Sequence, residues 1–162
     1  MGGIELALPR GLSERSRYPV MGEDAVKEAP KPTYQDARLL LEIAKQTQDT
    51  AFQKAREWFF ASLPEEPITL EEFEQKFPKG SEGSSHLDFL SSHFETAGVL
   101  VKYKLLNEDL YFDRYFVEPY WDRSKKIIRG EREKYHPAIA ENFEWLARRA
   151  AAWRRKQASR KK

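Results

Sequence analysis

Apolar residues recur at steps of three and four along most of the chain from Thr33 onward, and this spacing restricts the fold more than any other feature of the sequence. Residues at such steps share one face of a helix. No segment alternates apolar and polar residues at a period of two, and no Asn-Gly or Asp-Gly hairpin signal is present. The sequence therefore predicts an all-α fold. The clearest series consists of Leu40, Ile43, Ala44, Thr47, Ala51, Ala55, Trp58 and Phe59.

Capping residues and prolines divide this pattern into five to six helices. Residues 33–36 resemble a capping box with aspartate in place of glutamate, and residues 69–72 form a complete one, so a helix should begin at each. Asp49 would be the N-cap of a further helix, although residues 47–50 could also be a surface turn within one long helix. We favour the break at Asp49.

The second half of the chain predicts three further helices. The first begins at one of the two serines in residues 84–85, and Gly98 caps its end. The next has Asn107 as its N-cap and is kinked by Pro119, and the last begins near Pro137. The residues that these helices should bury are Leu87, Leu90, Phe94, Ala97, Tyr111, Phe112, Tyr115, Phe116, Tyr120, Trp121, Phe143, Leu146, Ala147, Ala150 and Trp153.

The predicted helices belong to a single domain, because 162 residues are too few for two domains of ordinary size. We expect residues 33–157 to fold as an irregular orthogonal bundle. Residues 1–32 contain four prolines and no sustained periodicity, which is typical of a flexible N-terminal arm. Residues 158–162 are expected to form a disordered basic tail.

Several kinds of functional site lack the residues that they require. The chain has no cysteine, which excludes disulfides and thiolate metal sites. His86 and His93 are two helical turns apart, about 10 Å along the axis, which is too far to share an ion. No nucleophile motif or phosphate-binding loop occurs. We therefore expect no catalytic residues, no metal and no cofactor.

The location of the protein can be predicted from the absence of membrane and secretion signals. The sequence has no run of the ~20 apolar residues that a transmembrane segment needs. Its N-terminus lacks the basic start and apolar core of a secretory signal. The sequence therefore predicts a cytoplasmic protein without a transmembrane segment.

Charge is distributed unevenly along the chain. The net charge is +2, yet residues 145–162 contain eight Lys and Arg side chains and no acid, so the preceding body is acidic. A basic helix end can contact an acidic protein, a nucleic acid or a membrane, and it can also be a solvated end, because cations suit a helix C-terminus. The candidate contact residues are Arg148, Arg149, Arg154, Arg155 and Lys156.

These observations favour a non-enzymatic interaction domain that binds a protein partner. The alternative is a nucleic-acid-binding protein that uses the basic C-terminal helix and tail. The aromatic run around Phe112 and Phe116 is expected to be core, because only Arg114 supplies the positive charge that a base-stacking platform needs. If the basic residues have no external partner, acids of the body should neutralise them; the expected acids are Glu65, Glu66, Glu71 and Glu72.

Several segments are similar, in the same order, to one known family. They are residues 36–59, 86–102, 105–113, 119–121 and 141–147. Over residues 34–150 the chain thus resembles a bacterial family of helical domains that is catalogued only as a domain of unknown function. The resemblance implies a helical fold and a bacterial origin, and it brings no catalytic residues. Members of that family often carry a membrane helix before the domain, where this chain has a polar segment.

Overall fold

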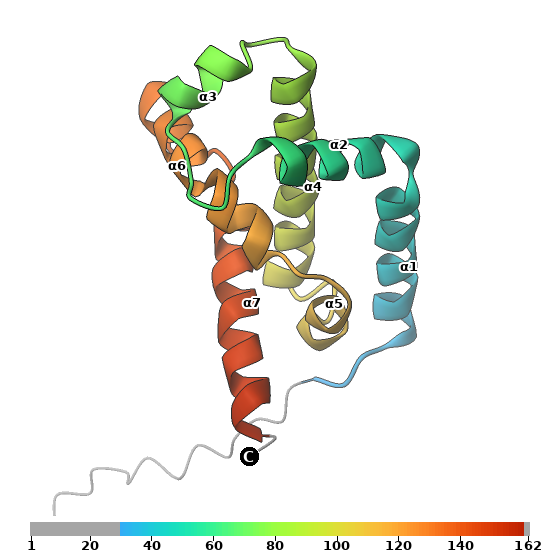
Figure 1. Ribbon diagram of the computed structural model, residues 1–162. Coiled ribbons are helices and arrows are strands. Elements are labelled where there is room, and N and C mark those ends of the chain that lie inside the picture. The colour runs from blue at the N-terminus through green and yellow to red at the C-terminus, as the bar shows by residue number, and fades with distance from the viewer. Residues whose placement is uncertain (1–29, 161–162) are drawn as a thin grey trace, which may run out of the picture.

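The computed structural model describes residues 30–160, and every element of regular structure in that range is an α-helix (Figure 1). The predicted all-α class is confirmed for these residues, but the predicted number of five to six helices is too low. The seven helices of the described range are α1 (Tyr34–Gln48), α2 (Thr50–Ser62), α3 (Leu70–Lys76), α4 (Glu82–Lys102), α5 (Glu108–Arg114), α6 (Glu118–Lys134) and α7 (Glu141–Arg160).

Both ends of the chain fall partly outside the described residues. Of the arm expected at residues 1–32, only residues 30–32 are described, and they are not helical. Helix α7 continues to Arg160, three residues past the expected end of the domain at 157, and residues 161–162 lie outside the described range. Between residues 30 and 160, no helix is both long and apolar enough to cross a membrane.

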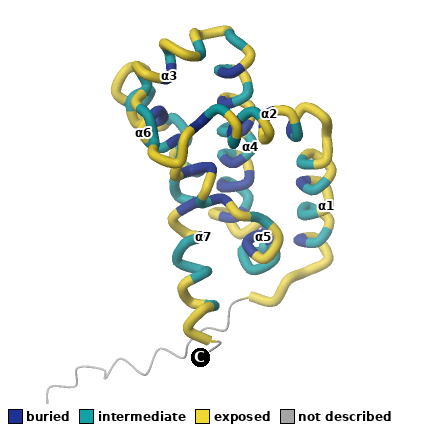
Figure 2. Tube along the Cα trace, viewed as in Figure 1, coloured by how far each residue is buried: buried dark blue, intermediate teal, exposed yellow. Residues whose placement is uncertain are grey.

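Helix α4 is the centre of the arrangement. It packs against α2 and α7, while α6 packs against α3 and α7. Figure 1 shows α2 lying crosswise to α4, and α7 continuing past the end of α4. Figure 2 shows buried residues repeated along α4 and an exposed end of α7. The predicted stripe of Leu87, Leu90, Phe94 and Ala97 is buried and therefore confirmed.

Helix α1 is linked to both α2 and α5. At its start, the buried carboxylate of Asp36 accepts hydrogen bonds from the backbone N–H groups of Thr33 (2.7 Å) and Asn107 (2.6 Å). The side-chain amide of Asn107 in turn donates to the carbonyl oxygen of Pro30 (2.7 Å). The hydroxyl of Thr33 also donates to this carboxylate, and these bonds lower the pKa of Asp36.

Four predicted N-caps agree with the structure. Thr33 and Thr69 each form a complete capping box, Asp49 caps α2, and Asn107 caps α5. The favoured break at Asp49 is therefore confirmed. These positions could be predicted because a capping side chain and the N–H group that it accepts from lie within three residues of each other.

Gly98 is not a helix cap, and that prediction is wrong. Helix α4 continues to Lys102, and Gly98 is buried inside it. A Cβ atom at Gly98 would lie 2.4 Å from the carbonyl oxygen of Asn142, so only glycine lets the backbones of α4 and α7 approach this closely. The left-handed residue that ends the helix is Lys104, with a φ of 58°.

Residues 107–121 belong to two helices rather than to one kinked helix. Helix α5 ends at Arg114, and α6 begins at Glu118 with Pro119 in its first turn. Inside a helix, the proline ring clashes with the carbonyl group four residues earlier, and the missing N–H removes a hydrogen bond. Neither effect matters in the first turn of a new helix. This division raises the number of helices above the predicted range.

Two helix starts also differ from the prediction. Helix α4 begins at Glu82, with Ser81 as its N-cap, rather than at residues 84–85. Helix α7 begins at Glu141 rather than near Pro137. The reason is the backbone of Ala140, whose φ of 52° is left-handed and cannot continue a right-handed helix.

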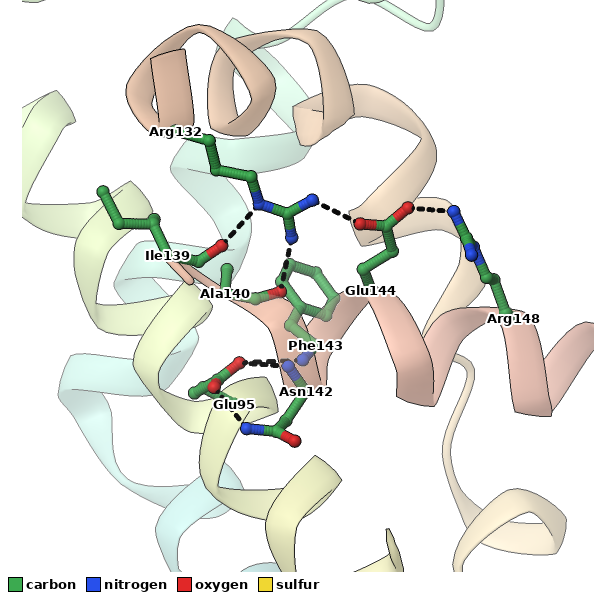
Figure 3. A network of polar contacts seen from close by, with 8 residues as sticks. All are labelled: Glu95, Arg132, Ile139, Ala140, Asn142, Phe143, Glu144 and Arg148. Atoms are coloured by element: carbon green, nitrogen blue, oxygen red, sulfur yellow. Dashed lines mark hydrogen bonds and ion pairs between the residues drawn. The ribbon is translucent and has the colours of Figure 1, made fainter. Parts of the chain in front are cut away.

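The first turn of α7 is capped by side chains from other helices (Figure 3). Glu95 of α4 accepts hydrogen bonds from the first backbone N–H groups of α7, including that of Asn142 (2.9 Å). Arg132 of α6 donates to the carbonyl oxygens of residues 139–140 and forms an ion pair with Glu144. The start of α7 is therefore fixed by tertiary contacts.

The predicted aromatic core is confirmed only in part. Phe112 and Trp121 are buried, but Phe116 is 63% exposed and Trp153 is only half-buried. In one continuous helix, Phe116 would lie on the same face as Phe112, four residues earlier. Because α5 ends at Arg114, the backbone turns and carries Phe116 to the surface.

Candidate functional site

Two of the basic side chains predicted to contact a partner are paired with acids of the protein. Arg149 in α7 donates one hydrogen bond to each carboxylate oxygen of Glu108 in α5, both of 2.6 Å. Two parallel bonds of this kind fix the guanidinium, and they raise the pKa of Arg149. Arg148 forms an ion pair with Glu144, one turn earlier in α7.

Arg154 is held by three groups of residues 115–118, the segment that joins α5 to α6 and the first residue of α6. It donates to the carboxylate of Glu118 (2.6 Å) and to the carbonyl oxygen of Tyr115 (2.8 Å). Its guanidinium also lies 4.0 Å from the centre of the Phe116 ring, within the range of a cation–π contact. Arg154 therefore connects α7 to this segment.

The remaining predicted residues, Arg155 and Lys156, are exposed. No ion pair of either side chain occurs between residues 30 and 160. Three of the five predicted side chains are thus occupied by internal acids, and two are free within the described part of the chain. The positive field of α7 is weaker than its sequence suggests.

The acids that were expected to neutralise α7 lie elsewhere, so that expectation is wrong. Glu65 and Glu66 approach Arg123 and Lys126 of α6, at 3.6 and 3.5 Å. Residues 71–72 lie in the first turn of α3, where their charge complements the helix dipole.

A pocket of about 340 Å³ lies where the end of α1, helices α2 and α4, and the segment between α5 and α6 meet. Its volume is within the range of roughly 300–1,000 Å³ that is typical of small-ligand sites. Sequence reasoning did not identify this site. The residues that line it are Thr47, Gln48, Phe52, Gln53, Arg56, Phe60, His93, Phe94, Arg114, Tyr115, Phe116, Pro119 and Tyr120.

The inner wall of the pocket is aromatic. The rings of Phe94 and Tyr120 lie 4.6 Å apart, and that of Phe60 meets Tyr120 edge-on at 4.9 Å. His93 stands edge-on to Phe52, with the ring centres 4.9 Å apart. Burial among these rings lowers the pKa of His93 to about 4, so its imidazole is neutral at pH 7.

Three tyrosines lie close together here: Tyr115 and Tyr120 line the pocket, and the buried Tyr111 is near both of them. The hydroxyls of Tyr115 and Thr47 are 3.5 Å apart. Burial raises the pKa of Tyr120, and Arg56, close to its hydroxyl, opposes that effect. The Tyr111 hydroxyl is buried and has no hydrogen-bond partner among the described residues. Its pKa is raised by burial and by the nearby hydroxyls of Tyr115 and Tyr120.

The rim of the pocket is positively charged. Arg56 and Arg114 are exposed, and no Asp or Glu occurs among the residues that line the pocket. The Arg114 guanidinium lies 5.3 Å from the centre of the Tyr115 ring. Neither arginine forms an ion pair within residues 30–160, whereas Arg149 and Arg154 each do. The two rim arginines are therefore available to an anionic ligand.

The three histidines are dispersed. His93 lies in the pocket, His86 packs on Trp58 with ring centres 5.6 Å apart, and His136 lies in the turn after α6. In the part of the chain that the structure describes, no group of three or more His, Cys, Asp or Glu side chains is placed to hold a metal ion.

One sequence signal could have drawn attention to the pocket. Arg114 is the single positive charge among the aromatic residues of segment 111–121, and Phe116 follows it closely. The break before Pro119 exposes both residues. The remaining positive charge, Arg56, comes from α2, and its proximity to Arg114 depends on the tertiary fold.

The comparison with known protein families gives one match. Residues 33–150 match the family described as a domain of unknown function (DUF4760). No curated protein and no solved structure matches the chain. The matched range includes every residue that lines the pocket, and it ends before Arg154, Arg155 and Lys156. Because the match covers most of the sequence, the chain belongs to the DUF4760 family.

Proposed function

We propose that this protein is a non-enzymatic interaction domain of the bacterial cytoplasm that binds a segment of a protein partner in the pocket between α2, α4 and the α5–α6 segment. One observation carries the proposal. The pocket combines an aromatic wall with two exposed arginines, Arg56 and Arg114, that have no acid partner among the described residues. Aromatic and arginine side chains are the residues that contribute most at protein interfaces.

The polar groups of the pocket suit binding better than catalysis. A general base needs a partner that orients it, but His93 is packed between rings and no carboxylate is among the lining residues. The Thr47 hydroxyl donates to the carbonyl oxygen of Ala44, one turn earlier in α1. His93 therefore lacks the arrangement of a general base, and the Thr47 hydroxyl lacks that of an activated nucleophile.

Nucleic-acid binding through α7 is the second candidate. The exposed side chains of Arg155 and Lys156 favour it. Arg149 and Arg154 do not support it, because each would have to leave a carboxylate partner to contact a phosphate. A protein that neutralises several phosphates shows a steep fall of affinity with salt, with a slope near −0.9 per contact on duplex DNA.

A peptide selection tests the proposal directly. Random peptides displayed on phage are selected against the full chain and then measured against two charge-reversed variants. One variant carries Arg56→Glu and Arg114→Glu, and the matched control carries Arg155→Glu and Lys156→Glu, which changes charge equally on α7. We expect the selected peptides to bind the control like the wild type and to lose binding to the pocket variant.

The opposite pattern would reject the proposal. If the selected peptides bind the pocket variant as tightly as the wild type, the pocket is not the interaction site. If duplex DNA binds the wild type at physiological ionic strength and the control variant loses that binding, the second candidate is correct.

A further inference from the structure

The size and wall of the pocket fit one aromatic side chain. A volume of about 340 Å³ is at the lower end of the range for whole small ligands, roughly 300–1,000 Å³. Phe60, Phe94 and Tyr120 all line the pocket, and their rings contact one another at centre distances of 4.6 and 4.9 Å. Aromatic rings pair in offset or edge-to-face arrangements, so a further ring finds suitable neighbours on this wall.

The charge around the wall favours a negative group on the same ligand. Arg56 and Arg114 are the only charged side chains among the residues that line the pocket, apart from the titratable His93. Tyr115 and Tyr120 also line the pocket and add polar hydroxyl groups to the otherwise aromatic wall.

We propose that the pocket recognises an aromatic side chain that adjoins an acidic residue in the partner, with the ring on the aromatic wall and the carboxylate between Arg56 and Arg114. This inference rests on the proposed function and names the chemistry of the partner. Arginine suits both parts of such a ligand, because its planar group binds a carboxylate through two parallel bonds and also stacks on rings.

Matched peptides test the two parts of the ligand separately. The probe is a capped Gly-Ser peptide with one Phe-Asp pair. In a second peptide Asn replaces Asp, which removes the charge at nearly constant shape, and in a third cyclohexylalanine replaces Phe. Binding is followed by the side-chain NMR signals of the histidines. His93 lies in the pocket, whereas His86 and His136 lie outside it and are internal controls.

We expect the Phe-Asp peptide to shift the His93 signal saturably and to bind about tenfold more tightly than the Phe-Asn peptide, as the loss of one charged hydrogen bond implies. The cyclohexylalanine peptide should also bind more weakly than the Phe-Asp peptide. In the variant with Arg56→Gln and Arg114→Gln, the preference for Asp over Asn should disappear. The control Arg155→Gln should keep it. Both rim arginines are exposed, so the variant should stay folded.

The outcomes separate this inference from the proposed function. Equal affinity for the Asp and Asn peptides, with a shift of His93, would overturn the predicted chemistry and leave the pocket as the binding site. Peptides from the phage selection that bind in the pocket but contain no acidic–aromatic pair would also overturn the predicted chemistry and leave the pocket as the binding site. If no peptide shifts His93 and the selected peptides ignore the pocket, both proposals are wrong.

Discussion

The contact between α4 and α7 and the pocket beside α1 are built on different principles. Where α4 meets α7, Gly98 lets the two backbones approach each other. Glu95 accepts hydrogen bonds from the first turn of α7, and Arg132 donates hydrogen bonds to the carbonyl groups just before it. At the pocket, Arg56 and Arg114 have no ion pair among the described residues, although both are close to buried aromatic rings. The polar groups at the α4–α7 contact thus find partners within the protein, whereas the two arginines at the pocket have no ion-pair partner among the described residues.

This difference separates stability from binding. A buried polar network that is fully satisfied makes a structure rigid, whereas exposed charges without an ion-pair partner are solvated, add little to stability and are free to bind another molecule. Natural proteins depart from internal consistency mainly at functional sites. Substitutions at the α4–α7 contact should therefore affect folding, and substitutions at the pocket rim should affect ligand binding.

The largest difference between the two regions should come from two aromatic residues of neighbouring segments. Trp121 is buried against Phe143, with ring centres 5.3 Å apart, whereas Phe116 at the pocket rim is 63% exposed. Trp121→Ala should cost about 3–5 kcal/mol of unfolding free energy, and Phe116→Ala less than about 1 kcal/mol. Urea denaturation followed by far-UV circular dichroism measures both. A comparable loss for Phe116→Ala would mean that the rim is part of the core.

A pH titration should show the cost of burying a neutral histidine at the pocket. In the folded protein His93 has a pKa of about 4, while an unfolded histidine has one of about 6.5. Between these values the unfolded state binds the extra proton, so stability is full above pH 6.5 and falls as the pH drops towards 4. The expected loss is roughly 2–3 kcal/mol.

The variant His93→Gln provides the control for this effect. It removes the titrating group, so the decline of stability between pH 6.5 and 4 should become shallower. Asp36 does not interfere in this range, because its lowered pKa places its own loss of stability at more acidic pH. An unchanged pH profile in His93→Gln would show that another group causes the decline.

The features that could be predicted from the sequence are local. The caps at Thr33, Asp49, Thr69 and Asn107 bind N–H groups within three residues, and the apolar stripe of α4 follows from its spacing alone. Both signals are contained within a few turns of one helix. Tertiary contacts did not change them.

The features that could not be predicted depend on residues far apart in the sequence. The start of α7 is fixed by Glu95, 47 residues before Asn142, and Gly98 is needed because α7 approaches it. The neutralisation of Arg149 depends on Glu108, 41 residues earlier. Counting charges along the chain cannot show such pairs, so the sequence overstates the number of unpaired cations on α7. The pocket could not be predicted either, because its lining residues come from several helices.

The tight approach of α4 to α7 can be tested with one methyl group. Gly98→Ala would place a Cβ 2.4 Å from the carbonyl oxygen of Asn142, so the helices must separate. The expected cost is about 1–3 kcal/mol, even though alanine favours helix formation. Ser92→Ala, at an exposed position of the same helix, should be neutral or slightly stabilising. Equal midpoints of thermal unfolding for the two variants would contradict the close approach.

The smallest effect should distinguish two neighbouring arginines of α7. Arg154 is hydrogen-bonded to Glu118 and to the carbonyl oxygen of Tyr115, whereas Arg155 is exposed and has no ion pair within the described residues. Arg154→Gln should therefore cost about 1 kcal/mol, as expected for a charged hydrogen bond that is partly open to solvent. Arg155→Gln should stay within about 0.5 kcal/mol of the wild type.

Salt provides the control for this last comparison. Part of the Arg154 contribution is electrostatic and partly exposed, so the difference between the two variants should shrink in high salt. The contact with the Phe116 ring and the bond to the Tyr115 carbonyl are less sensitive to screening, so the difference should not vanish. If Arg154→Gln and Arg155→Gln are equally stable in low salt, Arg154 forms no stabilising ion pair. Its charge would then be available, like that of Arg155, for contact with a nucleic acid.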